Sequence, residues 1–386
     1  MNFIAIKMLV GDRAKFLGII MGLTFASLLI TQQMAIFAGL MARTFGTITD
    51  LGQPDIWVMD PKVQFIDDVK AMQDTELLRV RGVGGVEWAV PLYKGLLTAR
   101  LDNGSFQSCN VLGLDDTTLI GGPPRMIKGR LEDLRRSDAV IVDAVGASEK
   151  LCKPSTTPGG KPVSLDVGDV LELNDHRAIV VGICAVSRTF QSQPVLYTTY
   201  SRATLFAPRE RKLLSFVLAK AKPGVDPKEL CDRIQAATGL MALTRDGFKM
   251  RTFMYFMKNT GIPINFGIAV VLGFIVGTAV AGQTFYNFTL DNLRHFGALK
   301  AMGAPDGTLL KMILLQALLV GYIGYGLGVG LAAFSGFASR KSELAFLMPW
   351  WLPVLSAFAV LVICSAASLI SMWKVIRLEP AVVFKG

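Results

Sequence analysis

The sequence predicts a membrane protein with four transmembrane α-helices and a large α+β domain inserted between the first and the second of them. The chain of 386 residues is 52% hydrophobic and only 18% charged. Soluble domains average about 25% charged residues, so the composition indicates a membrane protein. Four segments carry no charged residue, and each is longer than the ~20 residues that a helix needs to cross a bilayer. They are residues 16–42, 259–290, 312–339 and 344–373.

The N-terminal residues 1–15 are expected to form a short interfacial helix that leads into the first span, and a plain charged flank is the alternative. The apolar run that follows is much longer than the core of a signal peptide, which has about 7–15 residues. We therefore expect this run to be an uncleaved transmembrane helix.

Glycines recur at a spacing of four residues within three of the predicted spans. Such pairs let two helices approach closely, either within one subunit or between two copies, and the sequence leaves both alternatives open. The candidates for helix packing or dimer contacts are Gly18, Gly22, Gly273, Gly277, Gly324 and Gly328.

The net charge of +10 gathers beside the spans, which argues for a membrane and against a nucleic acid as the partner. Positive residues near span ends mark the cytoplasmic side. Both termini, including the tail 374–386, and the segment 291–311 are therefore expected in the cytoplasm, and residues 43–258 on the other side. Two residues in the third connection, Arg340 and Lys341, run against this rule. The residues that support it are Lys7, Arg13, Lys15, Arg294, Lys300, Lys311, Lys374, Arg377 and Lys385.

Residues 43–258 have the mixed composition of a soluble α+β domain. Helices are expected at 74–80 and 227–238, near the two ends of this region, with a β-rich middle between them. This pattern predicts two subdomains, of which the outer one is inserted within the sequence of the inner one. The expected strands are 55–59, 86–90, 96–99, 108–112, 139–142, 170–173, 178–186, 195–199 and 216–219.

The residue patterns of catalysis and nucleotide binding are missing from the sequence. It contains no G-x-x-x-x-G-K-[ST] nucleotide loop and no G-x-S-x-G elbow. Its only histidines are His176 and His295, which nearly excludes a histidine triad or a multi-histidine metal site. The five cysteines form no C-x-x-C pair, so disulfides and unpaired buried thiols both remain open. We expect no enzyme, no metal and no directly bound cofactor, and the energy for any work would arrive from elsewhere.

Residues 291–311 form a charged island between two apolar runs. In lipid each charged residue would cost about 2.5–3.5 kcal/mol, so the segment is expected in water directly beside the membrane. Gly303, followed by Pro305, is expected to end a helix here. Such a helix could bind in a groove of a partner protein, or it could be an ordinary solvated loop helix. Its apolar face would consist of Leu293, Phe296, Leu299 and Met302.

The text Arg294-His-Phe-Gly-Ala-Leu-Lys-Ala-Met-Gly-Ala304 resembles the coupling segment of the MacB/FtsX-type ABC transporter permeases. The likeness extends over essentially the whole chain, because a long outer domain follows the first span and three spans cluster near the C-terminus. The first-span text LLITQQMAIFAGL and the absence of a fused ATPase make the DevC-like exporter branch the nearest match. His295 is a departure, since many relatives carry an acidic residue at that position.

The resemblance implies a homodimer of permeases driven by two copies of a separate ATPase, which would bind the ATP and Mg. It also implies the bacterial inner membrane, a periplasmic outer domain, a membrane-fusion adaptor and an outer-membrane duct. Motion of residues 291–311 would reach the outer domain through residues 248–259 and drive the export of an amphipathic or lipid-like substrate. The coupling role is carried over to Leu293, Arg294, His295, Phe296, Gly297, Leu299, Lys300, Gly303 and Ala304.

Two alternatives remain open within the same superfamily. One is a permease that handles lipoproteins or lipids, with different partners and cargo. The other is an FtsX-like mechanical regulator that switches an extracytoplasmic hydrolase and exports nothing.

Overall fold

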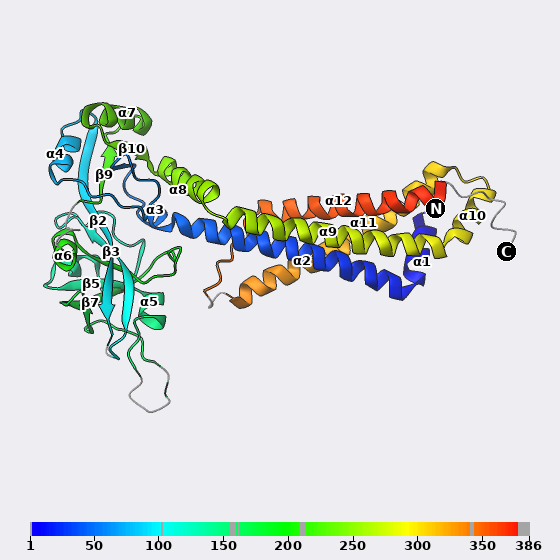
Figure 1. The fold of residues 1–386 in the computed structure, drawn as a ribbon, viewed down its shortest axis with the longest axis horizontal. Helices are drawn as coiled ribbons and strands as arrows, with labels where there is room; N and C mark the ends of the chain where they lie inside the picture. Colours follow the sequence, from blue (N-terminus) through cyan, green and yellow to red (C-terminus); the bar gives the residue numbers. More distant parts are fainter. Residues whose placement is uncertain are drawn as a thin grey trace. The chain divides into compact units, whose positions relative to one another are not determined.

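The computed structural model describes residues 2–101, 103–154, 160, 162–208, 214–339 and 343–376. The chain divides into two compact units (Figure 1). We call Met1–Leu40 together with Gly261–Gly386 the helical unit, and Met41–Thr260 the outer unit. The predicted features that lie outside the described residues are Arg340, Lys341, Arg377, Lys385 and the rest of the tail beyond residue 376.

Four helices are long and apolar enough to cross a membrane, which confirms the four predicted spans. α11 begins ahead of the charge-free run, because Pro305 precedes the helix and the acidic Asp306 is favourable in its first turn. α12 begins later than expected, and Pro349 disfavours helical geometry at the residue before it. The four helices are α2 (Arg13–Thr44), α9 (Ile262–Asp291), α11 (Asp306–Ala338) and α12 (Trp351–Ile376).

The six candidate glycines all lie against other helices of the helical unit. A Cβ added at Gly277 of α9 would lie 2.4 Å from the Cβ of Ala26, and one at Gly324 of α11 would lie 2.7 Å from the Cβ of Leu23. The small residues therefore bring α9 and α11 close to α2 within one chain, which is one of the two alternatives left open above. The other contacts join Gly18 to Thr284, Gly22 to Val280, Gly273 to Leu29 and Gly328 to Ser27.

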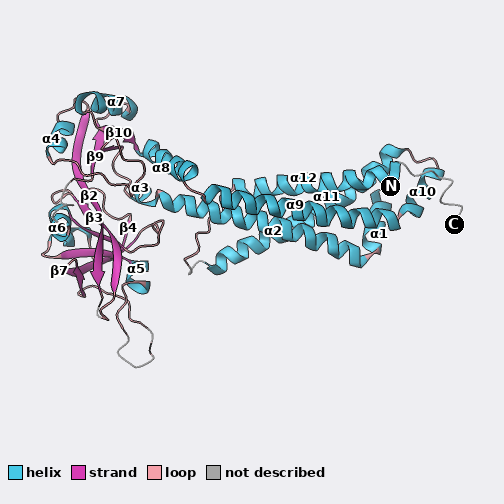
Figure 2. Ribbon diagram, viewed as in Figure 1, coloured by secondary structure: helices cyan, strands magenta, loops and turns pink. Residues whose placement is uncertain are grey.

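The outer unit is built on a mixed sheet whose strands follow the order β10-β1-β9-β2-β3-β8-β5-β7-β4, while β6 pairs with β2 and β7 (Figure 2). The long strand β2 joins two groups of strands, since its first half pairs with β9 and its second half with β3. The strands are β1 (Ile56–Met59), β2 (Val86–Arg100), β3 (Phe106–Leu114), β4 (Arg125–Lys128), β5 (Ala139–Asp143), β6 (Val170–Leu173), β7 (His176–Ala185), β8 (Val195–Thr199), β9 (Phe216–Ala221) and β10 (Met241–Thr244).

The order of these strands nests one group within the sequence of the other. β3 to β8 come from the middle of the unit, whereas β1, β9 and β10 come from its two ends. The expected strands 86–90 and 96–99 are one strand, because the fixed φ of Pro91 between them is compatible with extended backbone. β4 and β10 were not expected, and each has only four residues.

Short helices surround the sheet. α4 and α7 occupy the two stretches where helices were predicted, whereas α5 and α6 lie in the middle, where only strands and turns were expected. Each of these two is too short to show an amphipathic repeat. The helices are α3 (Gly46–Asp50), α4 (Thr75–Arg81), α5 (Ala144–Glu149), α6 (Tyr200–Phe206), α7 (Pro227–Thr238) and α8 (Arg245–Asn259), with a 3-10 helix η1 (Leu131–Arg135).

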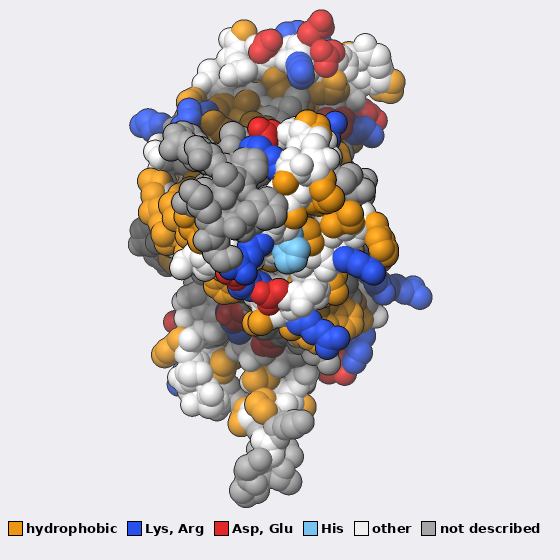
Figure 3. All heavy atoms as spheres, turned by 90° about the vertical axis from the view of Figure 1, so that its right-hand side faces the viewer, with side chains coloured by type: hydrophobic (Ala, Val, Ile, Leu, Met, Phe, Trp, Pro, Cys, Tyr) orange, Lys and Arg blue, Asp and Glu red, His pale blue; other side chains and the backbone are white. Residues whose placement is uncertain are grey.

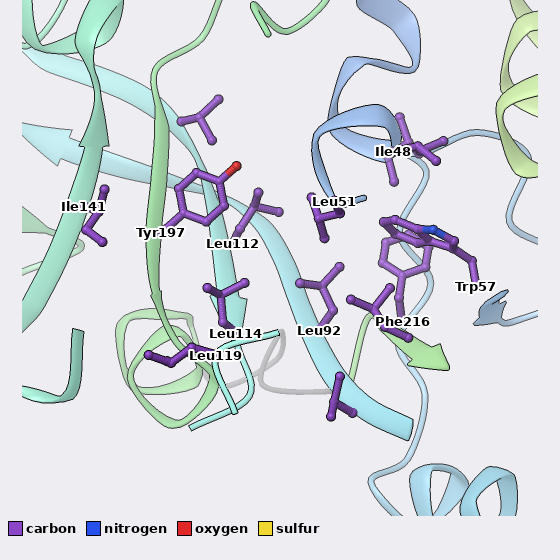
Figure 4. Packing of buried hydrophobic residues seen from close by; sticks show 14 of the residues in the cluster. Ile48, Leu51, Trp57, Leu92, Leu112, Leu114, Leu119, Ile141, Tyr197 and Phe216 are labelled. Atoms are coloured by element: carbon purple, nitrogen blue, oxygen red, sulfur yellow. The ribbon is translucent and has the colours of Figure 1, made fainter. Parts of the chain in front are cut away.

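The core of the outer unit gathers large apolar side chains from both groups of strands (Figure 4). Trp57 is fully buried, and its ring lies 5.5 Å from that of Phe216, measured between centroids. The ring of Phe248 on α8 lies at the same distance from Trp57 and 5.9 Å from the ring of Phe216. The helix α8 is therefore anchored in the core through an aromatic contact.

All five cysteines are free thiols, so the alternative of unpaired cysteines holds.

Candidate functional site

The charged segment between α9 and α11 folds into a separate short helix, α10 (Leu293–Ala301). Helix α9 ends at Asp291, and Asn292 separates it from α10. The carbonyl of Asn292 accepts a hydrogen bond from Phe296 N at 3.1 Å. At the other end Gly303 has φ +95°, a conformation that glycine adopts without strain. Ala304 N donates back to Leu299 O at 3.0 Å, which closes the end of the helix.

One face of α10 is covered by the helical unit itself. Phe296 is fully buried against Leu309 and Ile313 of α11 and Ala5 of α1 (Asn2–Gly11). Gly297 is buried as well, and Leu293, Leu299 and Ala304 are partly buried against the same cluster. Three of the four residues of the expected apolar face, Leu293, Phe296 and Leu299, therefore pack within the chain, whereas Met302 is exposed.

The helix α1 completes the pocket around Phe296. Its Ala5 carbonyl accepts a buried hydrogen bond of 2.7 Å from Gln316 Nε2 of α11. A buried amide must keep its partner, because losing it costs about 1–3 kcal/mol. This bond thus helps to hold α1 against α11 and, through Ala5, supports α10.

Ion pairs hold both ends of the segment. Lys300 Nζ lies 2.9 Å from the Asp306 carboxylate at the start of α11. Before α10, Asp291 pairs with Lys15 near the start of α2, and Lys15 also pairs with Asp12 at 3.0 Å. Each pair involves partly exposed groups and contributes little to stability, so the effect of the pairs with Asp306 and Asp291 is chiefly to orient α10.

The opposite face of α10 is open. It carries Arg294, His295, Ala298, Ala301 and Met302, of which Met302 is 76% exposed. Viewed from the end of the helical unit that carries α10, the surface shows Lys and Arg side chains beside hydrophobic ones (Figure 3). Met302 was expected on the apolar face with Phe296, and Ala298 and Ala301 were not among the predicted site residues. Helical spacings of four, seven and eight residues place all three on the face of Arg294, although these spacings do not show which face the chain covers.

The remaining assigned residues divide between the two faces. Arg294, His295 and Gly303 are exposed, whereas Lys300 is only partly exposed and faces Asp306. Within the described ranges, no group of three or more His, Cys, Asp or Glu residues could hold a metal ion. The site can therefore offer a basic, partly apolar helix surface for binding, with no reactive group assembled on it.

Known families match most of the chain. Residues 16–237 match the family described as MacB-like periplasmic core domain, and residues 264–380 match the one described as FtsX-like permease C-terminal. The first match alone spans more than half of the chain.

Similar proteins include an uncharacterised ABC transporter permease of Mycobacterium tuberculosis (strain H37Rv). It is 24% identical over 322 residues, which cover 81% of this chain and 79% of the relative. An uncharacterised ABC transporter permease of Mycobacterium bovis is 26% identical over 229 residues, which cover 57% of this chain and 59% of the relative.

Two solved structures, each of a domain outside the membrane, resemble about half of the chain. The periplasmic region of MacB from Actinobacillus actinomycetemcomitans has a TM-score of 0.38 at 15% identity, over 55% of this chain and 96% of that chain. The extracellular domain of the noncanonic ABC-type transporter YknZ from Gram-positive bacteria has a TM-score of 0.33 at 12% identity, over 50% of this chain and 98% of that chain. Because the two family matches together span both the outer domain and the C-terminal helices, this chain belongs to the ABC transporter permeases of the MacB/FtsX type.

Proposed function

We propose that this permease receives the energy of ATP hydrolysis from a separate ATPase that docks on the open face of α10. The observation that carries the proposal is the division of α10 into a face covered by α1 and α11 and an open face with Arg294, His295 and Met302. A surface with an exposed apolar side chain between basic ones suits a protein partner, since arginine and methionine are enriched in interfaces. ATP and Mg would be held by that partner, because the sequence has no nucleotide loop.

The path of the motion would follow the chain from α10 through α9 to α8. α8 is anchored by Phe248 in the core of the outer unit, and Arg251 Nε donates to Val63 O at 3.0 Å. A displacement of α8 would therefore carry the surrounding core with it, because packed interiors shift as units. This supports mechanotransmission, in which the outer domain moves and the spans form no polar channel.

We further propose that the permease works as a homodimer in a bacterial inner membrane and exports an amphipathic or lipid-like substrate. The termini would be cytoplasmic and the outer unit periplasmic, joined to an adaptor and an outer-membrane duct, as in the DevC-like branch. Gln283 and Asn287 are exposed on α9, and a second copy could satisfy their amides. This observation supports the homodimer.

The coupling assignment is tested by co-purification of the permease with its co-expressed ATPase. Met302→Asp places a charge on the open surface directly after the last residue of α10, and we expect binding to weaken about tenfold, or about 1.4 kcal/mol. Met250→Asp is the matched control, because Met250 lies on α8 of the outer unit and is 59% exposed. Both variants should reach the membrane in normal amounts.

Full ATPase binding by Met302→Asp would reject the open face as the docking surface. Leu299→Asp would be a less specific probe, since Leu299 supports the cluster around Phe296. Its loss of binding could follow from unfolding of α10 alone.

A further inference from the structure

The outer unit contains a cavity of about 680 Å³ that the transport mechanism above does not use. Its walls come from the segment 65–71, the middle of β2, the loop 189–193 and the end of α8. The loop is held in shape by Thr189 Oγ1, which accepts a hydrogen bond of 2.9 Å from Gln193 N. The volume lies within the range of small-molecule sites, which measure about 300–1,000 Å³.

Four aromatic rings from three separate segments form one wall of the cavity. Phe65 stacks on Tyr255 with ring centroids 4.4 Å apart and an interplanar angle of 21°. Phe256 lies edge-on to Phe65 at 5.4 Å, and Phe190 lies 4.9 Å from Phe256. Phe65, Phe190 and Tyr255 are only partly buried, so the wall offers apolar ring surface to a bound molecule.

The two charged residues that line the cavity differ in how exposed they are. Of the described residues that line it, only Lys94 and Asp67 carry a charge, and they form an ion pair. The side chain of Lys94 is 4% exposed, whereas that of Asp67 is 43% exposed. The carboxylate is therefore the more accessible of the two charged groups, and the lysine side chain is buried.

The position of Lys94 is fixed by the backbone of β2. Ser215 Oγ accepts from Lys94 N at 2.9 Å and donates to Lys94 O at 3.2 Å. These buried bonds hold the backbone at this point of the strand, while the ammonium group of Lys94 is held by its ion pair with Asp67.

We propose that this cavity binds an amphiphile with an apolar or aromatic body and a cationic group. The aromatic wall would hold the body, and the cation would lie near Asp67 and the ring faces, which attract positive charge. The inference deepens the proposed function by locating a binding site for an amphipathic substrate, and it rests on that function only for the bound molecule being cargo. Because Tyr255 and Phe256 belong to α8, the bound molecule would touch the helix that the coupling mechanism moves.

The test uses the full chain in lipid nanodiscs without any ATPase, so it does not depend on coupling. Tetraphenylphosphonium is the cationic probe and tetraphenylborate is its anionic counterpart of matched shape, each titrated calorimetrically against empty nanodiscs as the blank. We expect saturable binding of the cation to the wild-type protein and none of the anion.

Variants separate the contributions of charge and rings. Asp67→Asn and Phe190→Ala should each weaken binding of the cation about tenfold, whereas Lys94→Met should strengthen it several-fold, because the carboxylate loses its partner. The strengthening distinguishes a binding role from a structural one, since disruption of the ion pair alone would weaken binding in both charge variants. Asp232→Asn on the exposed side of α7 is the matched control and should leave binding unchanged.

Unaltered binding of the cation in Asp67→Asn and Phe190→Ala would overturn the proposal, as would preferred binding of the anion. Full ATPase binding by Met302→Asp, together with saturable binding of the cation to the wild type, would reject the docking surface and leave the cavity assignment standing. Weakened ATPase binding by Met302→Asp, together with no saturable binding of the cation to the wild type, would reject the cavity and leave the coupling assignment standing.

Discussion

Asp143 links two elements of the outer unit through a carboxylate that is only 7% exposed. Its Oδ2 accepts from Gly146 N at 2.7 Å at the start of α5, and its Oδ1 accepts from Val195 N at 2.7 Å at the start of β8. Burial raises the pKa of Asp143, and the backbone donors oppose that shift. Asp50 behaves similarly, because burial raises its pKa while Ser187 donates to it from both N and Oγ.

These two carboxyls predict how the stability of the outer unit depends on pH. Their folded pKa values lie above the ordinary 3.8, so the folded state keeps their protons at a pH where the unfolded chain has lost them. The resulting stabilisation is fully present below the ordinary value and is lost as the pH rises through the raised pKa values. We expect the contribution of these two carboxyls to the melting temperature to fall over that interval, measured by scanning fluorimetry as the difference between the wild type and variants that lack one of them.

Asp50→Asn and Asp143→Asn remove the titrating groups one at a time. Each variant should show a flatter dependence of melting temperature on pH above 3.8, whatever its absolute stability. Slopes identical to that of the wild type in both variants would mean that these carboxyls titrate alike in the folded and unfolded chains.

At the scale of elements, close helix approach in the helical unit depends on glycines that face their neighbours. Gly277→Leu would place a side chain where even a Cβ lies 2.4 Å from Ala26. Overpacking of this kind costs about 1–3 kcal/mol, so the melting temperature in detergent should fall. Gly326→Leu is the control, because nothing lies within 4 Å of a Cβ added there. Equal destabilisation by both substitutions would show that loss of glycine, rather than steric contact, is responsible.

For α10, the position and the end of the helix could be predicted from the sequence, but its open face could not. Its place between two spans, its helical state and its end at Gly303 all followed from local patterns of charge and glycine. Which face is open did not, because an apolar stripe is equally suited to a partner and to the chain's own distant residues. Ala5 and Ile313 cover Phe296, and no local pattern places them there.

At the scale of the whole molecule, the arrangement of charges predicts that α10 and the outer unit lie on opposite sides of the membrane. Met302→Cys should react with a membrane-impermeant maleimide only from the cytoplasmic side, and Phe106→Cys, at a site 71% exposed in the outer unit, only from the other side. The wild type serves as the blank, since four of its five thiols are buried and Cys152 is partly buried. Labelling of both positions from the same side would contradict the positive-inside assignment.

The sequence by itself determined the four spans, the insertion of the outer domain and the position of the charged segment, because each is written in a continuous run of residues. Because burying a charge in lipid is costly, charged segments stay outside the membrane and long charge-free runs cross it. Only the tertiary structure decided which face of α10 is open, that the glycines pack within one chain, and that Phe65, Phe190 and Tyr255 meet at one cavity. These features join residues far apart in sequence, and their formation depends on packing that periodicity does not encode.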